Sequence, residues 1–74
     1  MVTVRFHTQT EEWDGDGLTV ADLVTELRQG LGDIEPIPAG EELAIFINGR
    51  QAEPSYSFQG GESVEVKPKA GVLA

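Results

Sequence analysis

Few residue types in this chain could do chemistry. It has one histidine, His7, and no cysteine, which excludes a thiol nucleophile, a thiolate metal site and a disulfide. His7 could act as a general base, but no serine nucleophile can be paired with it from the sequence, and a solvated strand histidine is the simpler interpretation. Asp14 and Asp16 resemble part of a calcium loop, yet Leu18 and Thr25 stand where further ligands are needed. We therefore expect no catalytic residue, no metal site and no cofactor, and we predict that the protein is not an enzyme.

The balance of charge limits the classes of partner. The 74 residues include 13 acidic and 5 basic side chains, which gives a formal net charge of −8. Such a chain repels phosphate backbones and anionic lipid, so we expect neither a nucleic acid nor a membrane partner. A basic protein surface is the natural complement, and the alternative is that the acidity serves solubility or a salty cytoplasm. The first residues, M-V-T-V-R-F, do not resemble a signal peptide, so the expected location is cytoplasmic.

The elements that position these side chains begin with a hairpin. Residues 2–7 alternate between apolar and polar side chains, which predicts a half-buried strand. Residues 10–13 could form a second strand that pairs back on the first. The dipeptides Asp14-Gly15 and Asp16-Gly17 then mark a turn, because glycine adopts positive φ without steric cost.

A helix follows this turn. Thr19 and Asp22 have the spacing of a capping box, which satisfies helix amides that would otherwise have no acceptor. Gly30 stands where a helix stop is expected, so the helix should span Val20–Gln29. Its apolar residues recur at i, i+3, i+4 and i+7 and form one stripe: Val20, Leu23, Val24 and Leu27.

The second half of the chain predicts three more strands. Pro36 and Pro38 exclude regular structure from the connection at residues 30–42, where Ile34 and Ile37 should tuck under the sheet edge. Leu43–Ile47 is a strand that ends at the tight-turn dipeptide Asn48-Gly49. Residues 50–53 would form a short edge strand. After a loop that contains Tyr56 and Phe58, residues 63–66 form the last strand.

The predicted fold class is α+β, with the order β-β-α-β-β-β and one helix on one face of a mixed sheet. The β-grasp (ubiquitin-like) arrangement, in which the first and last strands lie parallel at the centre, fits this order. We predict a domain at residues 1–67 and a flexible C-terminal tail at residues 68–74. The expected core consists of Val2, Val4, Phe6, Val20, Leu23, Val24, Leu27, Leu43, Ile45, Ile47, Phe58, Val64 and Val66.

Several segments resemble the ubiquitin-like sulfur carriers of the MoaD/ThiS group. They are T-V-A-D-L-V-T-E-L at the helix, I-N-G-R-Q after the third strand, and F-Q-G-G-E-S-V-E-V, which is similar to the family pattern L-x-D-G-D-x-V before its final strand. The tail K-P-K-A-G is similar to the family's proline-containing run toward its terminus. The resemblance covers nearly the whole chain in order and spacing.

The resemblance implies a function carried by the tail. In that family a terminal Gly-Gly carboxylate is adenylated by an activating enzyme, then converted to a thiocarboxylate or joined to a lysine amine. Here Val72 and Leu73 occupy the diglycine positions in an ungapped alignment, whereas alignment on Ala70-Gly71 leaves V-L-A as an extension. Either the chain is a carrier or modifier that is trimmed to Gly71, or it is a non-conjugated interaction module. The candidate tail residues are Lys69, Ala70, Gly71 and Val72.

A partner surface is predicted on the sheet face opposite the helix. Alternation places Thr3, Arg5 and His7 there with Ala44, Phe46, Glu65 and Lys67. Phe46 would form an apolar spot surrounded by Arg5, His7 and Lys67, and similar proteins bind partners through this face. The simpler alternative is that single exposed apolar residues are ordinary. The expected partner is an activating-enzyme-like (MoeB-type) protein or a larger subunit, bound through this face and the tail, and the free chain is expected to be a monomer.

Overall fold

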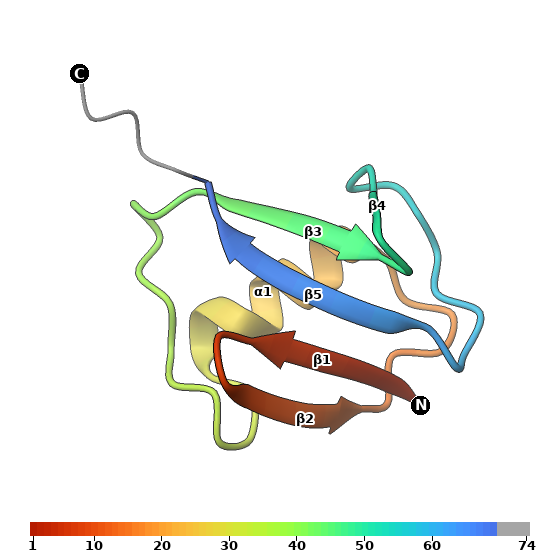
Figure 1. Ribbon diagram of the computed structural model, residues 1–74, viewed down its shortest axis with the longest axis horizontal. Helices are drawn as coiled ribbons and strands as arrows, with labels where there is room; N and C mark the ends of the chain where they lie inside the picture. The colour runs from red at the N-terminus through yellow and green to blue at the C-terminus, as the bar shows by residue number, and fades with distance from the viewer. Residues whose placement is uncertain (70–74) are drawn as a thin grey trace.

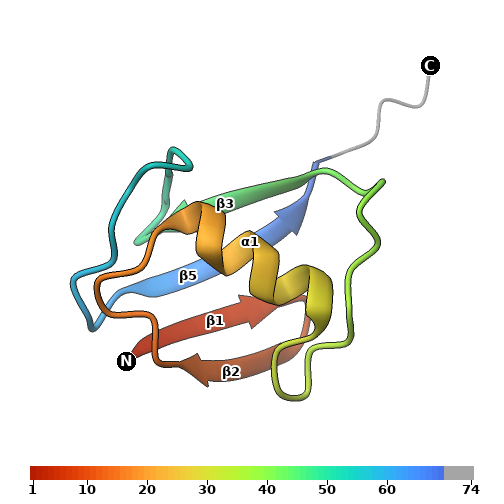
Figure 2. The same ribbon diagram turned by 180° about the vertical axis from the view of Figure 1, so that it is seen from behind.

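A computed structural model of the chain describes residues 1–69. One helix lies across one face of a five-stranded mixed sheet (Figures 1 and 2), so the predicted α+β class is confirmed. The strand order in the sheet is β2-β1-β5-β3-β4. The elements are β1 (Val2–Phe6), β2 (Gln9–Trp13), α1 (Val20–Gln29), β3 (Leu43–Ile47), β4 (Arg50–Gln51) and β5 (Ser63–Pro68).

The first and last strands pair in parallel at the centre of the sheet. Val4 of β1 lies opposite Val64 of β5, and Phe6 lies opposite Val66. The other edge of β5 pairs with β3 in antiparallel register. The C-terminal end of β5 therefore lies at the same end of the sheet as the β1–β2 turn and the connection at residues 30–42 (Figure 1).

The helix begins and ends where the sequence predicted. The Asp22 amide donates to the Thr19 hydroxyl over 3.3 Å, and the Asp22 carboxylate accepts from the Thr19 amide over 2.9 Å, which completes the capping box. Gly30 ends the helix with a φ of 100°. Three residues of the predicted stripe, Val20, Leu23 and Leu27, are buried against the sheet.

The connection between α1 and β3 is irregular but well anchored. The Ile37 amide donates to the carbonyl of Leu27 over 3.0 Å, and Arg28 Nη1 donates to the carbonyl of Pro38 over 2.6 Å. Ile34 and Ile37 are buried, as predicted. These contacts fix residues 34–38 against the C-terminal end of α1, where they form a wall beside the sheet.

Most predicted core residues are buried, and the core contains several more. Phe6, Val24 and Leu43 were predicted to be buried but are only partly so, because they lie at the edges of the cluster. Trp13 joins the core, where its ring meets that of Phe58 edge-on at a centroid distance of 5.5 Å. The core that results lies between α1 and one face of the sheet.

The last strand reaches slightly beyond the expected domain boundary at residue 67. Pro68 is still part of β5, opposite Leu43, and the Lys69 amide donates to the carbonyl of Glu42 over 2.9 Å. The described part of the chain therefore ends in a paired segment. Within residues 1–69, no helix has the length and apolar character needed to span a membrane.

Candidate functional site

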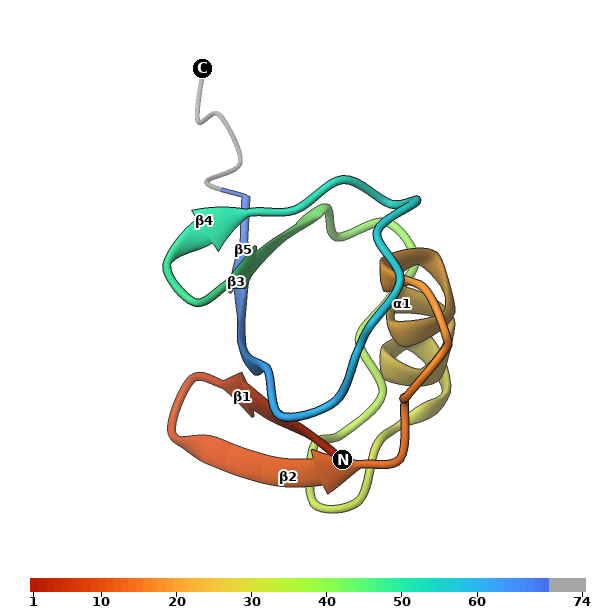
Figure 3. The ribbon, with the colours of Figure 1, turned by 90° about the vertical axis from the view of Figure 1, so that its right-hand side faces the viewer.

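The candidate partner surface is the sheet face that α1 does not cover. Figure 3 shows α1 on one side of the sheet and no helix on the other among the described residues. Three side chains form one row across the central strands of this face. Arg5 lies opposite Glu65, and Glu65 lies opposite Phe46. The predicted register is therefore correct for Arg5, Phe46 and Glu65, since Ile45 and Ile47 beside Phe46 point into the core.

Phe46 is half-buried on this face and lies beneath a cation. Lys67 Nζ is 5.4 Å from the centroid of the Phe46 ring, within the range of a cation–π interaction. The same ammonium group is 3.9 Å from Glu65 Oε1. The surroundings of Phe46 thus contain both signs of charge, since Glu65 lies between Phe46 and Arg5. Of the three basic side chains expected around Phe46, Lys67 lies over its ring, whereas Arg5 is separated from it by Glu65.

His7 does not belong to this surface, which corrects its predicted placement. β1 ends at Phe6, and Phe6 pairs with Gln9, so His7 and Thr8 form the two-residue β1–β2 turn. His7 has a φ of 56°, in the left-handed region that few residues other than glycine adopt. Its ring packs on the Phe6 ring at a centroid distance of 4.2 Å. The alternation of strand side chains therefore stops one residue before His7.

Arg5 and Ala44 differ from their predicted roles in smaller ways. Arg5 is exposed on the open face as expected, but its Nε donates to the carbonyl of His7 over 3.3 Å and so supports the turn. Ala44 is on the open face by register, yet only 8% of its surface is exposed. A methyl group beside larger side chains on paired strands is easily covered, so Ala44 offers little surface to a partner.

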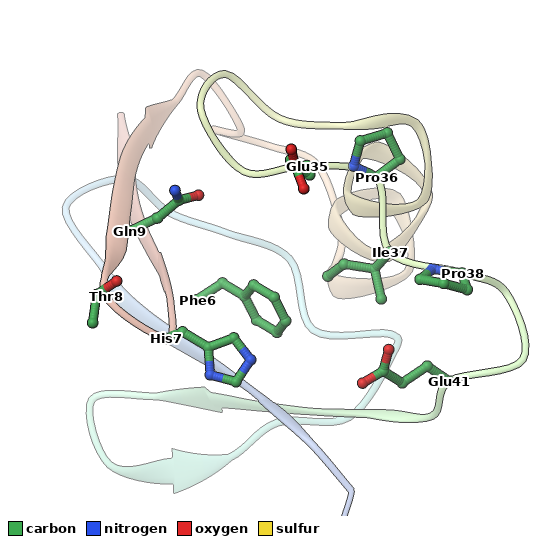
Figure 4. A pocket seen from close by; sticks show the side chains of 9 residues that line it. All are labelled: Phe6, His7, Thr8, Gln9, Glu35, Pro36, Ile37, Pro38 and Glu41. Carbon is green, nitrogen blue, oxygen red and sulfur yellow. The ribbon is translucent and has the colours of Figure 1, made fainter.

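His7, which lies in the β1–β2 turn, lines a hollow at that end of the sheet. Figure 4 shows this hollow between the β1–β2 turn and the connection at residues 30–42. Its volume is about 330 Å³, and its lining combines the rings of Phe6 and His7 with Ile37 and the carboxylates of Glu35 and Glu41. Sequence reasoning missed this site, because its two walls are far apart in the chain and neither wall has a recognisable motif.

A buried carboxylate, Glu62, is the other feature that the sequence did not indicate. It is 6% exposed and accepts 2.7 Å hydrogen bonds from the Tyr56 hydroxyl and from the amides of Gln59 and Gly60. Burial by itself raises the pKa of the Glu62 carboxyl. The hydrogen bonds from Gln59, Tyr56 and Gly60 outweigh burial and hold this pKa below its usual value. Glu62 thus fastens the loop before β5.

Within residues 1–69, no group of three or more histidine, aspartate and glutamate side chains is placed to hold a metal ion. Lys69 lies beside Glu42, with its Nζ 3.8 Å from Glu42 Oε1. The other predicted tail residues, Ala70, Gly71 and Val72, lie outside the described residues.

No protein-family model and no curated protein that was compared with the chain matched it.

Proposed function

We propose that the chain is a β-grasp protein of the ubiquitin-like type that works as a carrier or modifier, with a C-terminal tail that is trimmed to Gly71 and then activated. The observation that supports this proposal most is the position of β5. This strand pairs with β1 on one side and with β3 on the other, and the pairing continues to Pro68. A parallel central pair with one helix across one face is the arrangement of a β-grasp fold.

The central position of β5 matters because it fixes where the tail starts. The Lys69 amide donates a hydrogen bond to the carbonyl of Glu42, so the chain is held against the body up to Lys69. Activation of a C-terminal carboxylate requires that the last residues enter another protein's active site. A rigid starting point lowers the entropic cost of placing that carboxylate.

The chemistry of the proposal belongs to the tail and to the activating enzyme. Hydrolysis of the Gly71–Val72 peptide bond produces a terminal carboxylate on Gly71. That carboxylate attacks the α-phosphorus of ATP, pyrophosphate leaves, and an acyl adenylate forms. A sulfur nucleophile or a lysine amine then displaces AMP. With Ala70-Gly71 aligned to the diglycine, trimming is needed because V-L-A follows the carboxylate that must react and adds bulky side chains to a segment that passes through a narrow channel, where glycine causes no clash.

The open face is the proposed docking surface for the activating enzyme or for a larger subunit. Phe46 on β3 supplies an aromatic anchor, Lys67 supplies a cation on the neighbouring strand β5, and Arg5 supplies another on β1, beyond β5. Aromatic and arginine side chains contribute most of the energy in many interfaces. A partner could replace the Lys67–Phe46 contact with its own groups at little cost, since both side chains are partly solvated.

A second candidate function is a non-conjugated interaction module. It is favoured by one specific observation, the sequence V-L-A after Gly71, which blocks the carboxylate chemistry as long as it stays attached. In this case the Phe46 face would be the working surface and the tail would have no chemical role.

An exchange assay separates the two functions. The full-length chain and a chain that ends at Gly71 are each incubated with ATP, labelled pyrophosphate and the adenylating-enzyme fraction of the source cells. We expect pyrophosphate exchange with the chain that ends at Gly71 and none with the full-length chain. In the shortened chain, Phe46→Ala should raise KM, whereas Leu18→Ala, which removes an exposed apolar side chain elsewhere, should leave KM unchanged. Absence of exchange with both chains favours the module.

A further inference from the structure

The hollow beside His7 has walls that are already held in place. The Phe6 and His7 rings form one side, at the tip of the β1–β2 hairpin. The other side is residues 35–38, which are fixed to α1 by the bonds from the Ile37 amide and from Arg28 Nη1. The Glu41 amide also donates to the carbonyl of Pro38 over 3.0 Å. Binding in this hollow therefore requires little ordering of the protein.

The lining of the hollow is apolar at its base and acidic at its rim. Ile37 is 3% exposed and Phe6 is half-buried, and both contribute apolar surface. The Glu41 carboxylate points across the hollow toward the His7 ring (Figure 4). Glu35 lies on the other side of Ile37 from Glu41. Among residues 1–69, no hydrogen bond or ion pair engages the side-chain carboxylate of Glu35 or Glu41. By contrast, neighbouring Glu42 is 3.8 Å from Lys69 Nζ.

We propose that this hollow, which we name the His7 pocket and define by Phe6, His7, Glu35, Ile37 and Glu41, binds an arginine side chain of a protein partner. An aliphatic stem fits the apolar base. A planar guanidinium group can stack on one of the two rings, Phe6 or His7, whose planes are inclined by 54°, while it donates to the carboxylates. The charge is complementary, because the pocket has two carboxylates on a protein with a net charge of −8. Lysine should bind less well, because its compact ammonium group has no flat surface that can stack on an aromatic ring.

The location of the pocket indicates which partner would bring the arginine. Glu41 of the rim is adjacent in the chain to Glu42, which accepts from the Lys69 amide at the end of β5. A protein that receives the tail therefore also meets the pocket. This identification of the partner depends on the proposed function, whereas the recognition of arginine depends only on the pocket.

The test uses two small probes that differ in charge and share a shape. The ¹⁵N-labelled full chain is titrated with N-acetyl-arginine methylamide and with its neutral isostere, N-acetyl-citrulline methylamide, at an ionic strength of about 0.15 M, which suppresses long-range attraction. We expect saturable shifts of the amides at residues 6–9, 35, 37 and 41. The arginine probe should bind about fivefold more tightly than the citrulline probe, or about 1 kcal/mol at 1.4 kcal/mol per tenfold.

Carboxamide variants locate the source of this preference. The double variant Glu35→Gln/Glu41→Gln should bind both probes equally. Glu53→Gln should keep the preference, because it removes an exposed carboxylate beside Pro54, whose carbonyl accepts from the Ala21 amide in the first turn of α1, away from the pocket. Equal binding of the two probes to the unmodified chain, absence of binding, or shifts centred away from the pocket would overturn the inference. Because the titration does not involve the tail, its failure is distinct from failure of the exchange assay.

Discussion

The Tyr56 hydroxyl donates a 2.7 Å hydrogen bond to the carboxylate of Glu62, which is almost fully buried at the start of β5. Two backbone amides, those of Gln59 and Gly60, donate to the same carboxylate. Glu62 thereby closes the loop that leads into the central strand. The strand that carries the tail is thus fixed at its start by this carboxylate and along its length by β1 and β3.

Replacement of this carboxylate should destabilise the fold. Glu62→Gln preserves the shape of the side chain but removes its charge and directs an amide group toward the donors. We expect the free energy of unfolding to fall by about 1–3 kcal/mol, since a buried donor without a partner costs this much. Urea unfolding at neutral pH measures the loss. Tyr56→Phe removes one of the three donors and should cost less, and an equal or greater loss for Tyr56→Phe would contradict this account.

The Glu62 carboxylate should also make the stability of the fold depend on pH. The pKa of Glu62 is lowered in the folded state from its usual value of 4.5, because hydrogen bonds to the carboxylate outweigh the effect of burial. A lowered pKa gives stability that is fully present above the unfolded-state value and is lost as pH falls through the folded-state value. The difference in unfolding free energy between the native chain and Glu62→Gln should therefore be constant above about pH 5 and shrink below it. A difference that stays constant into the acid range would show that the carboxylate is not the cause.

Adjacent residues of β3 should respond very differently to truncation. Ile45 is 4% exposed and faces α1, so Ile45→Ala should cost about 2–5 kcal/mol of unfolding free energy. Phe46 faces the other way and is half-buried, so Phe46→Ala should cost about 1 kcal/mol, the scale of its contact with Lys67. Circular dichroism during urea unfolding measures both. Comparable losses would mean that Phe46 is a core residue and is not available to a partner.

The capping box leads to a prediction that compares two threonine-to-alanine variants, one at the start of α1 and one within it. Thr19→Ala removes the hydroxyl that accepts from the Asp22 amide and should lower the unfolding free energy by about 1 kcal/mol. Thr25→Ala removes a hydroxyl that bonds the carbonyl of Ala21 within the helix. Because alanine is the better helix former, this control should leave stability unchanged or slightly higher. Thermal unfolding of both variants distinguishes a capping effect from a general loss of threonine contacts.

Local signals explain what the sequence predicted correctly. The bounds of α1 depend on the Thr19–Asp22 pair and on Gly30, which lie next to the helix they define. The β3 register follows from period-two alternation, which placed Ile45 inside and Phe46 outside. These features need no information about distant segments, so a single sequence is sufficient.

The errors come from interactions between segments. His7 continues the polar positions of β1, and only the Phe6–Gln9 pairing shows that it belongs to a turn. That turn contains no glycine or asparagine, so the usual signal for positive φ is absent. Glu62 is one of thirteen acidic residues, and its burial depends on donors from Tyr56 and two amides of the preceding loop. The His7 pocket was missed for the same reason, since its walls come from separate parts of the chain.

Intact mass spectrometry of the protein recovered from its native cells tests the central claim most directly. The account predicts a chain that ends at Gly71, with a fraction in which one terminal oxygen is replaced by sulfur or the carboxyl group is joined to a lysine amine. A chain that ends at Ala74 under every growth condition, including sulfur limitation, would contradict the claim and leave the Phe46 face as the working surface.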